Sequence, residues 1–271
     1  MRIAQVAPPW VAVPPTGYGG IEWIVSLLAD GLVDRGHDVT LYATGDSTTK
    51  ARLEYAFAEA PGSAAINDAW YDVVHQQRVV ADAARFDVLH QHTAYAAMVA
   101  AMAVDVPVVH TLHNAATSKL RRIYEGVAGS VRFVAISEAQ RRGVPELGDV
   151  DVVYNGIDLE GYPYRESKED FLLFLGRTSP DKGPRRAVEA ARAAGMPLVM
   201  AVKRAEPVEV EHWDRDVEPI LGDDVTVIGE IPLEEKVDLL ARARAVLFPI
   251  DWDEPFGLVM TEAMACGTPV V

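Results

Sequence analysis

The sequence contains little cysteine, no long apolar run and fewer basic than acidic residues. Among its 271 residues there is a single cysteine, Cys266, so an internal disulfide is excluded and the compartment is left open. No apolar run reaches the roughly 20 residues that a transmembrane helix needs. The first ten residues lack the charged-then-apolar pattern of a secretory signal peptide. We therefore expect a cytoplasmic protein.

The acidic excess restricts the partners. There are 40 Asp and Glu residues against 25 Lys and Arg, a net charge of −15. This argues against a general nucleic-acid binder and against strong electrostatic binding to anionic lipid, although a local basic pocket stays compatible with it. The length suits one large domain or two modest ones.

Short apolar strands alternate with helical patterns along the chain. The strand 2–7 is followed by apolar residues at helical spacing up to Gly36 and by a second strand, 37–43. This βαβ opening predicts a parallel sheet. Further strands are expected at 87–90, 107–111, 131–135, 171–175, 197–202, 225–228 and 245–248. The fold class is therefore predicted to be α/β.

Glycine and histidine follow strand ends in the first half. Gly19 and Gly20 lie between the first strand and the first helix, where glycine lets backbone N–H groups approach a phosphate. No G-x-G-x-x-G is present, and a bare Gly-Gly is equally consistent with a turn. His90 and His92 share one face of a strand end, but no third metal ligand is apparent. His113 follows the next strand, at the rim where sites form, and either binds a ligand or anchors its loop.

Cations follow a strand end in the second half. Arg177 and Lys182 lie between the strand 171–175 and a helix that starts at Pro184. Arginine binds phosphate oxygens through its planar fork, and lysine acts as a point charge. In a chain this acidic, two such cations indicate an anionic ligand or an ion pair with Asp181 or a neighbouring helix. Lys203, at the end of the next strand, is a third candidate.

The most informative stretch is 248–271. An acidic loop follows a strand, and Pro255 is expected to start a helix. Glu254 precedes this helix and Glu262 lies about two turns into it, with an anion-favouring helix N-terminus between them. The two carboxylates could each bind hydroxyl groups, and the helix N-terminus between them could bind a diphosphate. A nucleotide diphosphate sugar carries hydroxyl groups on both sides of its diphosphate and fits this order. The alternative is a surface helix with two solvated glutamates.

These motifs resemble a known family. Glu254 to Glu262 matches the E-x7-E motif of retaining glycosyltransferases with the GT-B fold, and the run EPFGLVMTEAMACGTPVV resembles glycosyltransferase family 4. The likeness implies two Rossmann-like domains facing a cleft, an acceptor-side domain at 1–158 and a donor domain at 159–271. Family members usually continue beyond the point that corresponds to Val271, so the second domain is expected to be incomplete.

The resemblance also implies an activity: transfer of a sugar from a nucleotide diphosphate sugar to an acceptor hydroxyl, with retention of configuration and with neither metal nor other cofactor. The residues implied to carry the reaction are His113, Glu254, Arg177 and Lys182. The residues implied to bind the donor are Gly19, Gly20, Arg177, Lys182, Phe256, Gly257, Leu258 and Glu262, with Lys203 as a further cation on the phosphate side.

Each of these residues has an implied role. Arg177 and Lys182 would stabilise the leaving nucleoside diphosphate as charge develops on it. Glu254 would bind hydroxyls of the donor sugar, and Glu262 those of the ribose. His113 would contact the donor sugar and the reacting centre, whereas His92 is at most an acceptor-side contact. Backbone N–H groups at 256–258 would face the junction of phosphate and sugar.

Some features depart from the family pattern or leave alternatives open. Asp251-Trp252-Asp253 spells the D-x-D of Mg²⁺-dependent transferases, but it belongs to the E-x7-E phrase and we interpret it as an acidic loop. The residues 203–206 replace a glycine-rich turn. A GT-B relative such as a nucleotide-sugar epimerase would lack this phrase; a non-catalytic nucleotide-sugar-binding protein or fragment is the other alternative. No nucleic-acid partner is expected, and a lipid acceptor would imply weak association with a membrane surface.

Overall fold

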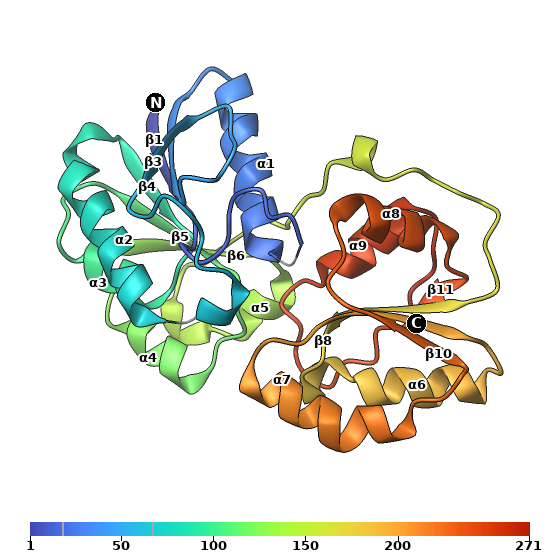
Figure 1. The fold of residues 1–271 in the computed structure, drawn as a ribbon. Coiled ribbons are helices and arrows are strands. Elements are labelled where there is room, and N and C mark those ends of the chain that lie inside the picture. Colours follow the sequence, from blue (N-terminus) through green and yellow to red (C-terminus); the bar gives the residue numbers. More distant parts are fainter. Residues whose placement is uncertain (18, 67) are drawn as a thin grey trace. The chain divides into compact units, whose positions relative to one another are not determined.

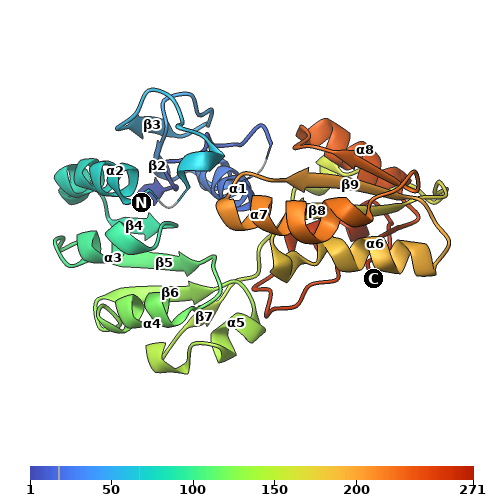
Figure 2. The same cartoon turned by 60° about the horizontal axis from the view of Figure 1, so that its bottom comes forward.

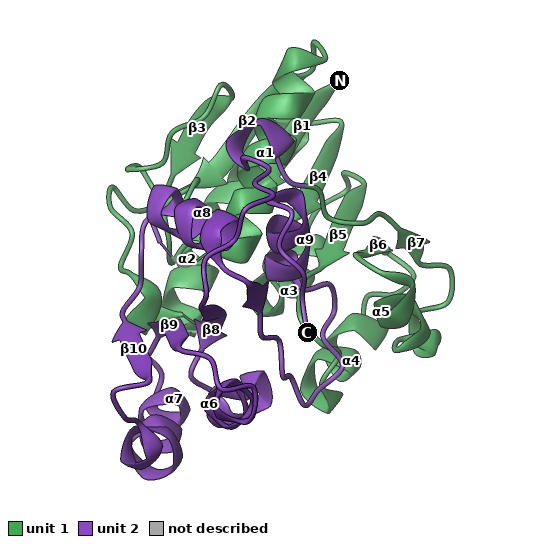
Figure 3. Cartoon of the chain, turned by 90° about the vertical axis from the view of Figure 1, so that its right-hand side faces the viewer, with its two compact units in different colours: residues 1–15, 19–156 green, residues 16–18, 157–271 purple. Residues whose placement is uncertain are grey.

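A computed structural model describes residues 1–17, 19–66 and 68–271. The chain divides into two compact units (Figure 3). Among the described residues, unit 1 comprises 1–15 and 19–156, and unit 2 comprises 157–271 together with 16 and 17. The boundary predicted from the sequence lies after residue 158, and the two units divide after residue 156.

Unit 1 is a parallel sheet with helices on both faces (Figure 1). Its described strands are β1 (Arg2–Val6), β2 (Asp38–Ala43), β3 (Arg52–Tyr55), β4 (Val88–Gln91), β5 (Val108–Leu112), β6 (Val131–Ala135) and β7 (Asp151–Val152). Its described α-helices are α1 (Gly20–Asp34), α2 (Ala69–Asp82), α3 (Tyr95–Ala101), α4 (Ser118–Glu125) and α5 (Glu138–Arg142). The strand order is β3-β2-β1-β4-β5-β6-β7, so β1 has β2 on one side and β4 on the other.

The core of unit 1 follows from the alternation of side chains along each strand. On β2, Leu41 packs in a cluster with Val25 of α1, whereas the next residue, Tyr42, packs in a second cluster with Val79 of α2 and Met98 of α3. Figure 2 shows α2, α3 and α4 together on one side of this sheet. Both faces are therefore covered, as a parallel sheet requires.

Unit 2 repeats the plan with fewer strands. Its described strands are β8 (Leu172–Arg177), β9 (Leu198–Lys203), β10 (Val225–Ile228) and β11 (Ala245–Val246), in the parallel order β10-β9-β8-β11. Its described α-helices are α6 (Pro184–Ala193), α7 (Pro207–His212), α8 (Leu233–Arg242) and α9 (Leu258–Ala265). Phe174 packs towards α6, and its neighbour Leu173 packs towards α8 and α9. A bridge between Val246 and Val270 extends the sheet beside β11.

Several expected boundaries were wrong. The last helix begins at Leu258, three residues after Pro255, so Glu262 lies little more than one turn into it. Strand β8 extends through Arg177, which is therefore a strand residue. Strand β3 and helix α7 were not predicted. No helix in the described part of the chain is long and apolar enough to cross a membrane.

Candidate functional site

The strand order of unit 2 reverses at β8, which has β9 on one side and β11 on the other. Connections leave β8 and β11 towards opposite faces, and ligands of open α/β sheets bind at the carboxyl edge beside such a point. The connection after β8 carries Lys182, and the one after β11 carries Glu254. The backbone N–H of Asp251 donates to the carbonyl of Asp181 at 2.8 Å, which ties the two loops together.

Lys182 and Glu254 form an ion pair at this point. Their side chains are only 17% and 16% exposed. The Lys182 ammonium also lies 4.7 Å from the centre of the Trp252 ring, a cation–π distance. The structure therefore brings together the residue predicted to bind phosphate and the residue predicted to bind sugar hydroxyls, and each neutralises the other.

Two further cations lie side by side at the same edge. Arg177 and Lys203 are partner residues in the β8–β9 ladder. The Lys203 ammonium lies 3.0 Å from Glu206 and 3.4 Å from Glu209, and the Arg177 guanidinium lies 3.7 Å from Glu209. Lys203 and Glu209 are buried. Arg177 therefore forms the ion pairs that the sequence left open as an alternative, including one with Asp181 at 3.6 Å. Lys203 is surrounded by carboxylates.

Sequence reasoning missed Glu209. Glu206 and Glu209 form a reciprocal capping box at the start of α7, with Pro207 at the first helical position. Glu209 accepts from the N–H groups of Ala205 and Glu206 at 2.9 and 3.0 Å. Acceptor side chains at the N-cap and at N3, with proline between them, were a sequence signal for this helix start.

Glu262 is buried on α9 and is not a solvated surface residue. Its Oε1 accepts from the Tyr162 hydroxyl at 2.8 Å and from the Lys236 ammonium at 2.7 Å. No hydrogen bond within the described residues uses its Oε2, so this oxygen can accept a ligand hydroxyl.

The start of α9 supplies backbone donors. Gly257 precedes Leu258 in a left-handed conformation with φ of +79°. This backbone conformation favours glycine, whereas the nearest atom to an added Cβ, the Met260 methyl carbon at 2.5 Å, ends a flexible side chain that can move aside. The free N–H groups of this first turn, which follows Phe256, favour an anion.

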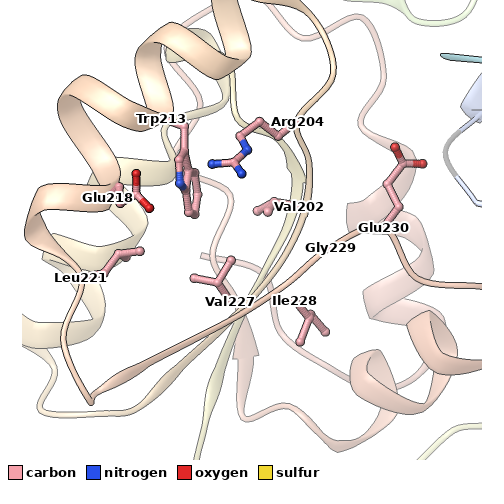
Figure 4. A pocket seen from close by; sticks show the side chains of 9 residues that line it. All are labelled: Val202, Arg204, Trp213, Glu218, Leu221, Val227, Ile228, Gly229 and Glu230. Carbon is pink, nitrogen blue, oxygen red and sulfur yellow. The ribbon is translucent and has the colours of Figure 1, made fainter. Parts of the chain in front are cut away.

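A pocket of about 520 Å³ opens beside the ends of β9 and β10 (Figure 4). The Arg204 guanidinium lies 5.6 Å from the centre of the buried Trp213 ring. Val202, Val227 and Ile228 line the pocket, which continues to the Gly229–Glu230 turn. Its combination of an aromatic ring, apolar walls and a cation suits a flat heteroaromatic group.

In unit 1, Gly19 lies just before α1 with φ of +153°, and Gly20 is the first residue of the helix. A Cβ atom on Gly19 would lie 2.7 Å from Pro15 and 2.9 Å from the Glu22 carboxylate. Burial raises the pKa of Glu22 to about 7. Tyr18, which precedes the two glycines, lies outside the described residues.

His113 takes part in a chain of histidines at the carboxyl edge of unit 1. Its Nε2 lies 2.8 Å from Nδ1 of His92, whose Nε2 lies 2.9 Å from Oε1 of Gln5. The rings of His90 and His92 lie 4.2 Å apart on one face. Among the described residues no group of three potential ligands could hold a metal ion. Sequence reasoning missed Gln5, because a lone glutamine in a strand gives no signal.

Comparison with known proteins decides the family. The profile described as "Glycosyltransferase Family 4" matches residues 18–160, and "Glycosyl transferases group 1" matches residues 163–271. Glycosyltransferase family 4 includes this chain. A phosphatidyl-myo-inositol mannosyltransferase of Propionibacterium freudenreichii subsp. shermanii is 30% identical, over all of this chain and 76% of the relative. The corresponding enzyme of Mycolicibacterium smegmatis is also 30% identical, over 100% of this chain and 75% of its own.

Solved structures agree on the fold. AviGT4, a glycosyltransferase involved in avilamycin A biosynthesis, is 30% identical with a TM-score of 0.70, over 99% of this chain and 77% of its own. Sucrose-phosphate synthase from Thermosynechococcus elongatus has a TM-score of 0.78 at 19% identity, over 99% and 80% of the two chains. This family 4 glycosyltransferase therefore has the predicted GT-B fold, and it acts on a glycosyl donor and an acceptor.

In this glycosyltransferase most of the predicted donor-binding residues belong to unit 2, where they lie at the end of β8, in the loops after β8 and β11, and on α9. The predicted residues of unit 1, Gly19, Gly20 and His113, follow β1 and β5. Both groups lie at the carboxyl edges of their own sheets, where the alternation of strands and helices places them.

Proposed function

We propose that this glycosyltransferase takes its sugar from a nucleoside diphosphate sugar, and that unit 2 binds the donor. The observation that carries the proposal is a pair of cations, Arg177 at the end of β8 and Lys182 in the loop after it, where Lys182 contacts Glu254 of the loop that leads to α9. They supply cationic donors at this sheet edge in a chain whose net charge is −15, and a diphosphate would take the place of the carboxylates that pair with them. A diphosphate is the anion whose size and charge suit them.

The donor's parts would be bound in order. Arg177, Lys182 and the N–H groups at the start of α9 would contact the diphosphate. Glu262 would accept from a ribose hydroxyl through its Oε2. Glu254 would accept from hydroxyls of the sugar once the phosphate has replaced it as the partner of Lys182. The pocket that Arg204 and Trp213 line would hold the base.

The chemistry would be electrostatic. When the bond between the sugar and the diphosphate breaks, negative charge grows on the leaving phosphate, and fixed cations stabilise that charge more than they stabilise the bound donor. We propose that this suffices without a bound metal, that configuration is retained, and that the leaving phosphate takes the proton of the acceptor hydroxyl. His113 would contact the donor sugar, and Lys203 would add positive potential from its buried position.

The acceptor is proposed to be a hydroxyl compound, with inositol-containing acceptors first to be tested. Two of the relatives carry the name phosphatidyl-myo-inositol mannosyltransferase, and one of Frankia alni is a D-inositol 3-phosphate glycosyltransferase, 30% identical over 69% of this chain. A lipid acceptor would bring the protein to a membrane surface from a cytoplasmic location.

A thermal-shift screen against UDP-, GDP-, ADP- and dTDP-sugars tests the donor class, because a ligand that binds the folded state raises its apparent stability. Replacing Arg177 by alanine should weaken binding of the selected nucleotide at least tenfold, the cost of a lost charge-assisted contact of about 1.5 kcal/mol. The control is Arg185→Ala, which removes a surface arginine paired with Glu189.

Unchanged affinity in Arg177→Ala would contradict the phosphate assignment. Turnover in the presence of EDTA tests the metal-free reaction, and the anomeric coupling constant of the product tests retention. A protein that binds a nucleotide sugar but transfers it to no acceptor, and hydrolyses none, would contradict the proposed donor chemistry.

A further inference from the structure

A continuous chain of hydrogen bonds crosses the carboxyl edge of the unit 1 sheet. Gln5 and His90 are partners in the β1–β4 ladder, and Nε2 of Gln5 lies 3.3 Å from Nδ1 of His90. Nε2 of His90 lies 2.8 Å from the Thr111 hydroxyl. In the other direction, Oε1 of Gln5 lies 2.9 Å from Nε2 of His92. Nδ1 of His92 lies 2.8 Å from Nε2 of His113.

The three rings are neutral near pH 7. Burial lowers the pKa of His90 to about 4 and that of His113 to about 3, and it lowers the pKa of His92 well below its ordinary value. A neutral imidazole has one nitrogen that donates and one that accepts, so a hydrogen bond to one nitrogen decides the role of the other.

The amide of Gln5 has a donor end and an acceptor end. Together they determine which nitrogen of each histidine in the chain of hydrogen bonds donates and which accepts. Its Oε1 can only accept, so Nε2 of His92 carries the hydrogen and Nδ1 of His92 is bare. The bond between His92 and His113 then requires Nε2 of His113 to donate. Consequently Nδ1 of His113 carries a lone pair.

The other arm of the chain is consistent with this assignment. Nε2 of Gln5 donates to Nδ1 of His90, so Nε2 of His90 carries the hydrogen and donates to the Thr111 hydroxyl. Each ring nitrogen between Thr111 and His113 thus meets a partner of the opposite role. The opposite orientation of the Gln5 amide would exchange donor and acceptor in every hydrogen bond of the chain, and His113 would then carry its hydrogen on Nδ1.

Nδ1 of His113 is the end of this chain. No hydrogen bond within the described residues uses that nitrogen, and His113 as a whole residue is partly exposed. We propose that Gln5 and His92 are positioning residues, which hold His113 in the Nε2–H tautomer and so present its Nδ1 as an acceptor for a hydroxyl of the bound sugar. The identity of the ligand rests on the proposed function, whereas the tautomer does not.

The tautomers are measured directly by long-range ¹H–¹⁵N correlation NMR on the full chain with ¹⁵N-labelled histidine, at pH 7.5 without ligand. In the wild-type protein we expect Nε2–H and a bare Nδ1 for His90, His92 and His113. An Nδ1–H tautomer for His113 would overturn the inference, and this measurement needs no variant that must fold.

Gln5→Met removes both ends of the amide while keeping the length of the side chain. We expect His113 to populate both tautomers and kcat/KM to fall about tenfold, the cost of about one misdirected hydrogen bond. The matched control is Gln76→Met, because Gln76 is also a buried glutamine of unit 1 but hydrogen-bonds Gln91 and Thr93 instead. This control should leave the signals of His113 unchanged.

A single Nε2–H tautomer for His113 in Gln5→Met would show that Gln5 does not position the ring, and this would overturn the inference. If the tautomers are as expected but no nucleotide sugar binds or reacts, the proposed function fails while the positioning role stands. If transfer occurs and the Gln5→Met change shifts the tautomer without changing kcat/KM, the acceptor role of Nδ1 is overturned.

Discussion

At the scale of single residues, Glu22 is a buried carboxyl without a cationic partner within hydrogen-bond distance among the described residues. Burial raises its pKa from an ordinary 4.5 to about 7. Between these values the folded state keeps a proton that the unfolded state releases, so stability falls as the pH rises through this range. The contribution is fully present below pH 4.5 and is lost above pH 7. A pKa rise of this size corresponds to about 3 kcal/mol.

We therefore expect the stability advantage of Glu22→Gln over the wild type to be about 1 kcal/mol larger at pH 8 than at pH 6, because glutamine has the same shape and never ionises. Urea unfolding at both pH values measures the difference. A constant difference between the two proteins at both pH values would contradict the raised pKa of this carboxyl.

Gly183 lies between Lys182 and α6 with φ of +71°. A Cβ atom there would overlap the carbonyl oxygen of Pro249, which is backbone and cannot move aside easily. Gly195 has a similar φ of +64° but nothing within 4 Å of the same position. Gly195→Ala should therefore cost only the left-handed strain of about 1 kcal/mol, and Gly183→Ala at least twice as much.

Thermal or urea unfolding of the two alanine variants, measured side by side, separates backbone strain from the overlap. Equal losses at both positions would show that the loop after β11 relaxes around the added carbon. Because Gly183 adjoins Lys182, the more destabilised variant should also bind nucleotide more weakly.

The sequence predicted some of these residues and could not predict others. The types and spacing of Arg177, Lys182, Glu254 and Glu262 follow from the motifs. The partners do not: Tyr162 and Lys236 reach Glu262 from 100 and 26 residues away. Such contacts depend on tertiary packing, which leaves no local pattern in the sequence.

At the scale of elements, the loops after β8 and β11 hold the ion pair of Lys182 and Glu254. In the proposed donor site the Glu254 carboxylate competes with the diphosphate for the Lys182 ammonium, and its negative charge repels the diphosphate. We therefore expect Glu254→Gln to bind the nucleoside diphosphate alone about threefold to tenfold more tightly, equivalent to about 1 kcal/mol. The same variant should transfer sugar much more slowly, because a carboxylate that binds sugar hydroxyls is lost.

Isothermal titration with the nucleoside diphosphate and steady-state kinetics with its sugar give the two readouts. Lys182→Ala is the matched partner variant and should weaken both binding and transfer. Weaker diphosphate binding in Glu254→Gln would mean that the carboxylate supports Lys182 in binding phosphate and does not compete with the phosphate.

Helices and strands with strong apolar runs were predicted well from the sequence. Elements whose presence or boundaries depend on tertiary contacts were not. The strands 131–135 and 225–228 match β6 and β10, because valine-rich runs of this length favour strands, although β10 at the sheet edge is only partly buried. Strand β3, Arg-Leu-Glu-Tyr at the sheet edge, has two charged residues among four, so its sequence does not predict a strand. Helix α9 starts late, because Pro255 lies in the loop and the left-handed Gly257 must come first.

At the scale of the whole molecule, the histidines are distributed unevenly between the units. Burial lowers the pKa of His75, His90, His92, His110 and His113, and all five belong to unit 1. A histidine with a lowered folded pKa contributes stability that is fully present above pH 6.5 and is lost as the pH falls, because the unfolded chain then binds a proton that the folded chain does not. Each such group costs about 1.4 kcal/mol per pH unit.

Unit 1 should consequently unfold at a higher pH than unit 2. Between pH 6 and 4.5 the five histidines together outweigh the buried carboxyls Glu22 and Asp72, whose raised pKa values act in the opposite direction, so unit 1 loses several kcal/mol within one pH unit. The paired carboxylates of unit 2, such as Asp216 with a pKa lowered to about 2, lose their contribution only in stronger acid.

Brief incubation at each pH, followed by pulsed hydrogen exchange at a fixed pH and mass spectrometry, shows which unit loses its protection. His75→Leu should move the transition of unit 1 to lower pH, whereas His37→Gln, outside the buried group, should not. Simultaneous loss of protection in both units would mean that they unfold as one cooperative body, and that the buried histidines of unit 1 set the acid limit of the whole chain.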